Sequence, residues 1–123
     1  MPKILTYDFC TLRFYSNYMI AEINEEHLTP NKNQVLIDSA KTHYVNNPFV
    51  YITYRKYSYS VDPVVFIKTS KISNLLGIAV VTATPASKSG NTKIEKLFYN
   101  KPYEIFSTLD DAIEWAQQIL EDD

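Results

Sequence analysis

The sequence predicts an α/β domain built on a mixed β-sheet, with an antiparallel strand pair at the N-terminus and about four helices. Three observations predict this class: short aromatic and β-branched runs recur along the chain, helix-start signals lie between them, and the two patterns alternate after the first strand pair. Such alternation is typical of a sheet with parallel neighbours, because each helix carries the chain back to the same edge. We expect about five strands.

Two of these strands form the N-terminal pair, on either side of a tight turn at Ser16-Asn17. The first is expected over Tyr7–Phe14 and the second over Tyr18–Ile23, where aromatic and β-branched residues alternate with polar ones. Three further strands are expected over Phe49–Tyr54, Leu76–Thr82 and Tyr103–Phe106. The run from Leu76 to Thr82 is nearly continuous in β-forming residues, which predicts a buried parallel strand.

The helices are predicted from their caps. Thr29-Pro30 combines a hydroxyl cap with proline at the first helical position, and Asn46-Asn47-Pro48 ends this helix. Asp62-Pro63 repeats the signal for a short helix running through Ile67.

Two more helices follow. Thr92 with Glu95 fits a capping box for the third, while Ser89-Gly90 leaves open a start nearer Pro85. Ser107, with Asp110 at the capping-box position, is expected to cap the last helix, whose apolar stripe is the clearest pattern in the chain.

Composition and net charge limit the classes of partner that the chain can bind. A net charge of −2 and a pI near 5.6 argue against electrostatic binding of nucleic acid or anionic membranes over a broad surface. Met1–Phe9 lacks the pattern of a secretory signal, and the apolar stretch Leu75–Val81 is far too short to span a bilayer. The lone Cys10 gives no disulfide framework. We expect a single cytoplasmic domain over residues 1–123, with no nucleic-acid partner and no stable membrane insertion.

Catalytic and metal-binding patterns are missing from the sequence. With Gly77 and Gly90 as the only glycines, phosphate-binding loops rich in glycine are excluded. Of the two histidines, His27 precedes the first helix and His43 is expected at the core edge on that helix's inward face. Cys10 is expected to pack in the core, with nothing to lower its thiol pKa. We therefore expect no enzymatic activity, no cofactor and no metal.

Six segments carry a family resemblance: Phe49-Val50-Tyr51-Ile52, Tyr59-Ser60-Val61-Asp62-Pro63, Gly77-Ile78-Ala79-Val80-Val81, Glu95-Lys96-Leu97-Phe98, Lys101-Pro102-Tyr103 and Ala112-Ile113-Glu114-Trp115. In these segments and in its order of elements, the chain resembles the STAS domain (sulphate transporter and anti-sigma-factor antagonist). It resembles more closely the short bacterial proteins described as SpoIIAA-like or STAS/SEC14-like. The resemblance implies a SpoIIAA-like fold and a non-enzymatic binding or regulatory module acting through protein contacts. Its SEC14-like side implies the alternative of a carrier or sensor of a small apolar ligand.

The chain departs from this family at one place. Anti-sigma-factor antagonists carry an Asp-Ser-Ser-Gly stretch at the start of the second helix, where a serine is phosphorylated. The equivalent region here, Ser58 to Pro63, has no glycine, and Pro63 occupies the helix start. Ser58 and Ser60 are nearby hydroxyls that do not match the motif, so the sequence leaves their phosphorylation open.

The candidate interaction loop consists of Arg55, Lys56, Tyr57, Ser58, Tyr59, Ser60 and Asp62. It follows an inner strand, at the carboxyl edge where open α/β sheets bind their ligands, and tyrosine and arginine are enriched in binding hot spots. Alternatively, the tyrosines pack on one another with Arg55 stacked on a ring.

The chemistry of this loop favours a protein partner, either another protein or a second copy of the chain, over a phosphate ligand. Asp62 as the cap places a carboxylate where a phosphate would lie, and Pro63 removes a donor. A small apolar ligand would instead require a cavity lined by Phe66, Ile67 and Phe98, whereas an interaction module requires a filled core and an exposed aromatic patch.

Folding is predicted to be independent of bound metal, because one cysteine and two histidines far apart in sequence make a closed structural site improbable. Treating the purified protein with a chelator should leave its thermal midpoint unchanged. A large fall in the midpoint would contradict this prediction.

Overall fold

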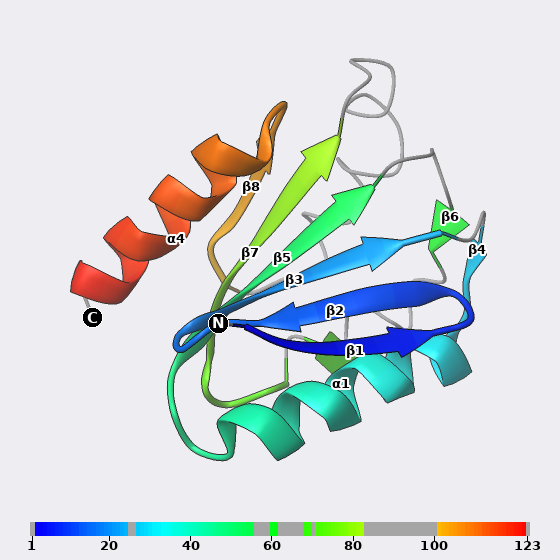
Figure 1. The fold of residues 1–123 in the computed structure, drawn as a ribbon. Helices are drawn as coiled ribbons and strands as arrows, with labels where there is room; N and C mark the ends of the chain where they lie inside the picture. Colours follow the sequence, from blue (N-terminus) through cyan, green and yellow to red (C-terminus); the bar gives the residue numbers. More distant parts are fainter. Residues whose placement is uncertain are drawn as a thin grey trace.

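The residues that the computed structural model describes are 2–24, 27–55, 60–61, 68–69, 71–82 and 101–122. They form a mixed sheet with a helix on each face (Figure 1). The elements are β1 (Lys3–Tyr7), β2 (Cys10–Phe14), β3 (Tyr18–Ile23), β4 (His27–Leu28), α1 (Pro30–Tyr44), β5 (Phe49–Arg55), β6 (Ser60–Val61), β7 (Leu75–Thr82), β8 (Tyr103–Phe106) and α4 (Leu109–Asp122).

The sheet contains six strands in the order β1-β2-β3-β5-β7-β8. Strands β1, β2 and β3 are antiparallel neighbours, whereas β3, β5, β7 and β8 run parallel to one another. The short strands β4 and β6 form a separate parallel pair. The mixed sheet with an antiparallel N-terminus is therefore confirmed, as are the inner positions of β5 and β7.

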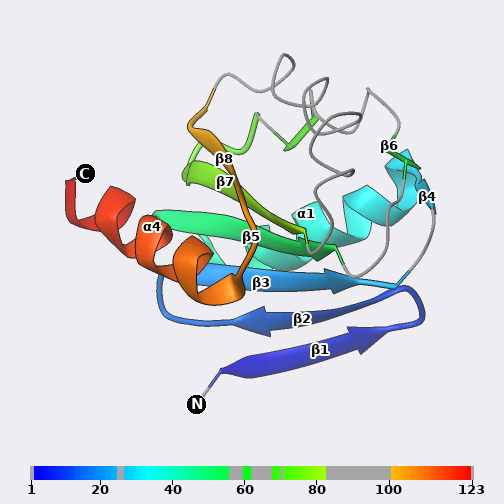
Figure 2. The ribbon, with the colours of Figure 1, turned by 90° about the horizontal axis from the view of Figure 1, so that it is seen from above.

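Two cores result, one on each face of the sheet. Alternate residues of β2 and β3, such as Leu12 and Met19, pack against α1 in the larger core. Residues of opposite parity, such as Ile20 and Ile52, pack against α4 in the smaller one. Viewed from above, α1 lies partly behind the strands (Figure 2). Strands buried on both faces require near-continuous apolar sequence, which is the pattern that β7 shows.

Helix α1 begins where its sequence signal predicts. The Thr29 hydroxyl accepts a hydrogen bond from the N–H of Lys32 at 3.3 Å, and Pro30 occupies the first helical position. The helix ends at Val45, whose φ of 55° is the one positive φ among the described non-glycine residues. Asn74 secures this end, because its amide donates to the carbonyls of Val45 and Asn47 at 3.3 and 2.8 Å.

Tyr44, in the last turn of α1, joins the helix to two other parts of the fold. Its ring is 1% exposed and stacks on Phe49 of β5 with centroids 4.4 Å apart. Its hydroxyl lies 3.0 Å from the carbonyl oxygen of Tyr15 and 2.6 Å from that of Tyr18, at the β2–β3 turn. Burial raises the pKa of this phenol, so Tyr44 holds its proton and remains a donor.

Helix α4 lies close to β7 because Gly77 has no side chain. A Cβ at this position would lie 3.2 Å from both Trp115 and Ile119 of the helix. Trp115 is half-buried and packs against the smaller core. The helix begins at Leu109, and the hydroxyl of Thr108, one residue after the predicted cap Ser107, accepts a hydrogen bond from the N–H of Asp111 at 3.3 Å.

Two expected counts differ from the structure. The first predicted strand, Tyr7–Phe14, is divided between β1 and β2 by a turn at Asp8-Phe9, so the sheet has six strands instead of about five. Helices α1 and α4 are the two helices of the described strand–helix order, not about four. The other two predicted helices, over 63–67 and 92–98, lie outside the described residues.

Replacing Tyr44 by phenylalanine should lower the free energy of unfolding by about 0.5–1.5 kcal/mol, because the partly buried hydrogen bond of its hydroxyl to the β2–β3 turn is lost while the ring contacts remain. Urea denaturation measures the change. Tyr7→Phe is the matched control, since that hydroxyl makes one partly buried contact with Ser39 and should matter less. Equal stability of Tyr44→Phe and the unmodified protein would contradict the role of the Tyr44 hydroxyl in joining α1 to the β2–β3 turn.

Candidate functional site

The candidate interaction loop leaves the sheet at its carboxyl edge. Its first residue, Arg55, ends β5 and pairs with Ile23 of β3 on one side and Thr82 of β7 on the other. The loop then returns to Ser60, which pairs in parallel with His27 of β4. Strands β3, β5 and β7 end at this edge, beside the β4–β6 pair (Figure 1).

The backbone on either side of the loop is therefore held by strand pairing, and β4 ends immediately before Thr29, the cap of α1. Other members of the predicted set lie outside the described residues: Lys56, Tyr57, Ser58, Tyr59 and Asp62. The structure thus places the backbone of two members of this set, Arg55 and Ser60, and leaves the contacts of its tyrosines as a prediction.

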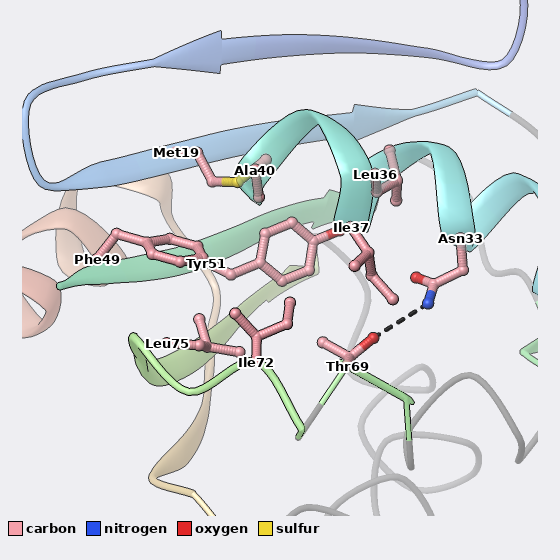
Figure 3. Close-up of a pocket in the computed structure, with 10 residues that line it drawn as sticks. All are labelled: Met19, Asn33, Leu36, Ile37, Ala40, Phe49, Tyr51, Thr69, Ile72 and Leu75. Carbon is pink, nitrogen blue, oxygen red and sulfur yellow. Dashed lines mark hydrogen bonds between the residues drawn. The ribbon is translucent and has the colours of Figure 1, made fainter. Parts of the chain in front are cut away.

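A small cavity lies beneath α1, between the helix, β5 and the segment that leads into β7 (Figure 3). Its described lining is almost entirely apolar and consists of Met19, Asn33, Leu36, Ile37, Ala40, Phe49, Tyr51, Thr69, Ile72 and Leu75. The two polar exceptions satisfy each other, because the Asn33 amide donates to the Thr69 hydroxyl at 3.1 Å.

The volume of this cavity limits the size of any molecule that it can accommodate. Its volume of about 20 Å³ is enough for one water molecule. Apolar cavities that bind a ligand as small as benzene are about 150 Å³. The cavity expected for an apolar ligand was assigned to Phe66, Ile67 and Phe98, which lie outside the described residues. The described lining therefore gives no room for such a ligand.

A broader depression lies at the opposite, amino edge of the sheet. It has a volume of about 720 Å³, and its lining includes Lys3, Tyr15, Tyr18, His43 and Gln117. Tyr15 and Tyr18 stack with centroids 4.6 Å apart and remain half-buried. This aromatic surface was not predicted from the sequence. The two tyrosines that flank the predicted turn at Ser16-Asn17 were the pattern that could have indicated it.

Cys10 and His43 both occupy the core positions that the sequence predicts. Cys10 is fully buried, and burial raises the pKa of its thiol to about 11. His43 stacks on Phe14 at 4.6 Å and meets Tyr44 edge-on. A thiol that stays protonated is a poor nucleophile, so this pair has no arrangement for nucleophilic catalysis.

The ammonium group of Lys101 is engaged in hydrogen bonds within the fold. Its Nζ donates to the carbonyl oxygens of Ile72 and Leu75, each at 2.7 Å. Burial lowers its pKa. These bonds hold the segment before β8 against the turn before β7, which is a structural role.

The described part of the chain contains no group of three or more His, Cys, Asp or Glu side chains able to hold a metal ion. None of its helices has the length and apolar character needed to cross a bilayer.

The fold is similar to a crystal structure of an uncharacterized protein from the DUF3478 family with a SpoIIAA-like fold, from Shewanella loihica PV-4. The TM-score is 0.59 and the sequence identity 13%, and the match covers 94% of this chain and 92% of that chain. No protein-family model and no curated protein matches the sequence. The chain therefore has a SpoIIAA-like fold, as its resemblance implied, and this similarity shows the fold alone.

The raised pKa of Cys10 predicts a pH dependence of stability. The native thiol keeps its proton up to about pH 11, whereas the unfolded thiol loses it near its ordinary value of 9.0. The native state is thus favoured below pH 9, and this contribution is lost as the pH rises through 11, by about 2 kcal/mol. The difference in unfolding free energy between the unmodified protein and Cys10→Ala should therefore shrink between pH 8 and 11; a constant difference would contradict it.

Proposed function

We propose that the protein is a non-enzymatic binding module that engages a protein partner at the carboxyl edge of its sheet, through residues 55–62. The observation that carries the proposal is the anchoring of this segment at both ends. Arg55 is held between β3 and β7, and Ser60–Val61 is held against β4. A segment fixed at both ends loses less conformational entropy on binding than a free one.

The composition of the segment suits a protein surface. Two tyrosines, Tyr57 and Tyr59, supply contact area, while Arg55 and Lys56 supply charge. The chain as a whole carries a net charge of −2, so these cations are a local feature.

The described cavity and side chains also favour binding over the alternatives. A cavity of about 20 Å³ is too small for a carrier of an apolar ligand. Cys10 is buried and protonated, and Lys101 is engaged by two carbonyls, so neither supports catalysis.

Changing Arg55, Tyr57 and Tyr59 together to alanine should abolish capture of a partner from a lysate of the native host, lowering its recovery by at least about ten-fold. The thermal midpoint should stay nearly constant, because surface substitutions usually change stability by less than about 0.5 kcal/mol. Quantitative mass spectrometry of the captured proteins and thermal melting give the two readouts.

The matched control changes three exposed residues elsewhere, Lys41, Asn46 and Lys71, to alanine. It should retain the partner. If the loop variant unfolds, its tyrosines belong to the core. If it folds and keeps the partner, the binding surface lies elsewhere and the proposal fails.

A further inference from the structure

Strand β1 forms one outer edge of the sheet, and within the described residues no strand pairs with its outer side (Figure 2). The direction of its free backbone groups follows from β2. Hydrogen bonds from Asn24 N to Phe9 O (2.8 Å) and from Tyr15 N to Tyr18 O (2.9 Å) show that odd-numbered residues of β2 bond toward β3. Its even-numbered residues therefore bond toward β1.

The residues of β1 opposite those even-numbered positions are Lys3, Leu5 and Tyr7. Because bonding direction alternates along a strand, Ile4 and Thr6 direct their N–H and C=O groups outward. The edge has no proline or bulge between these residues, so it lacks the usual protection against pairing. Ile4 is also 55% exposed.

This edge is complementary to itself. In an antiparallel pair of β1 strands related by a twofold axis at Leu5, Ile4 of each copy faces Thr6 of the other. Each Ile4–Thr6 pair joins two outward-facing residues and so closes two N–H···O bonds. Pro2, which has no N–H, then lies at the end of the ladder, opposite Asp8 of the second copy.

Side-chain charge supports the same register. Tyr7 contacts Ser39 of α1 through hydroxyl oxygens 3.0 Å apart, and the exposed Asp38 lines the same groove of about 270 Å³ between β1 and α1. The register places the exposed Lys3 of the second copy opposite Tyr7, on the face of the sheet that carries α1. Its ammonium then approaches the Asp38 carboxylate, and symmetry repeats this attraction.

We propose that two copies of the chain associate through β1, in this antiparallel register, to form one continuous sheet with Lys3 of each copy beside Asp38 of the other. Paired charges that attract only in this arrangement favour a second copy over an unrelated extended peptide. The proposal goes beyond the binding function, because it uses none of residues 55–62.

Sedimentation velocity of the full chain over a concentration series tests this association. The unmodified protein should form a dimer, and Asp38→Lys or Lys3→Glu alone should weaken it by about 10- to 100-fold through like-charge contact. The double variant Lys3→Glu with Asp38→Lys should restore the dimer, because the pair is re-formed with exchanged signs. Ile4→Pro should also weaken it, since it removes an N–H that bonds only across the edge.

Glu114→Lys and Lys71→Glu are the controls, because both change the net charge equally at exposed positions outside β1 and α1. They should leave the dimer unchanged, and circular dichroism checks that every variant is folded. A monomer at all concentrations would overturn the proposal. So would a dimer insensitive to Lys3 and Asp38, which would place the interface elsewhere.

Discussion

The fold depends most on the burial of one phenol at the end of α1. Tyr44 places a ring against Phe49 in the first inner parallel strand and a hydroxyl on two carbonyls of the β2–β3 turn. The antiparallel and parallel halves of the sheet meet at β3, so Tyr44 fixes the helix over that junction. Without this contact the helix would keep its hydrogen bonds to Tyr7 and Thr69, but it would lose its polar contact with the β2–β3 turn.

The two outer strands of the sheet, β1 and β8, have different surroundings. Helix α4 packs on β5, β7 and β8, and the absence of a side chain at Gly77 lets it approach β7 closely. Strand β1 lies at the other end, with outward backbone groups and an exposed Ile4. The carboxyl edge, where β5 ends at Arg55, is a third and separate surface. Association of two copies through β1 and binding of a partner at the carboxyl edge would therefore not compete for the same residues.

Local sequence signals predicted the elements that depend on local chemistry. Thr29 and Pro30 start α1, and the β-forming run through Val81 forms an inner parallel strand. The β1–β2 turn was missed because Asp8-Phe9 lacks the glycine or asparagine typical of tight turns. At the start of α4 the hydroxyls of Ser107 and Thr108 are adjacent, and the local pattern alone did not indicate that Thr108 accepts from the N–H of Asp111. The nearness of Lys3 and Asp38 to one groove could not be predicted, since it depends on how a strand and a distant helix pack.

The most direct test of the binding account is site-specific photocrosslinking in the native host. A photoreactive amino acid placed at Tyr57 reports contacts of the candidate loop, and the same group at Glu114, exposed on α4, reports a surface to which no partner is assigned. We expect a discrete crosslinked product with another protein from position 57 and none from position 114. Products from position 114 alone would contradict the assignment of binding to the carboxyl edge.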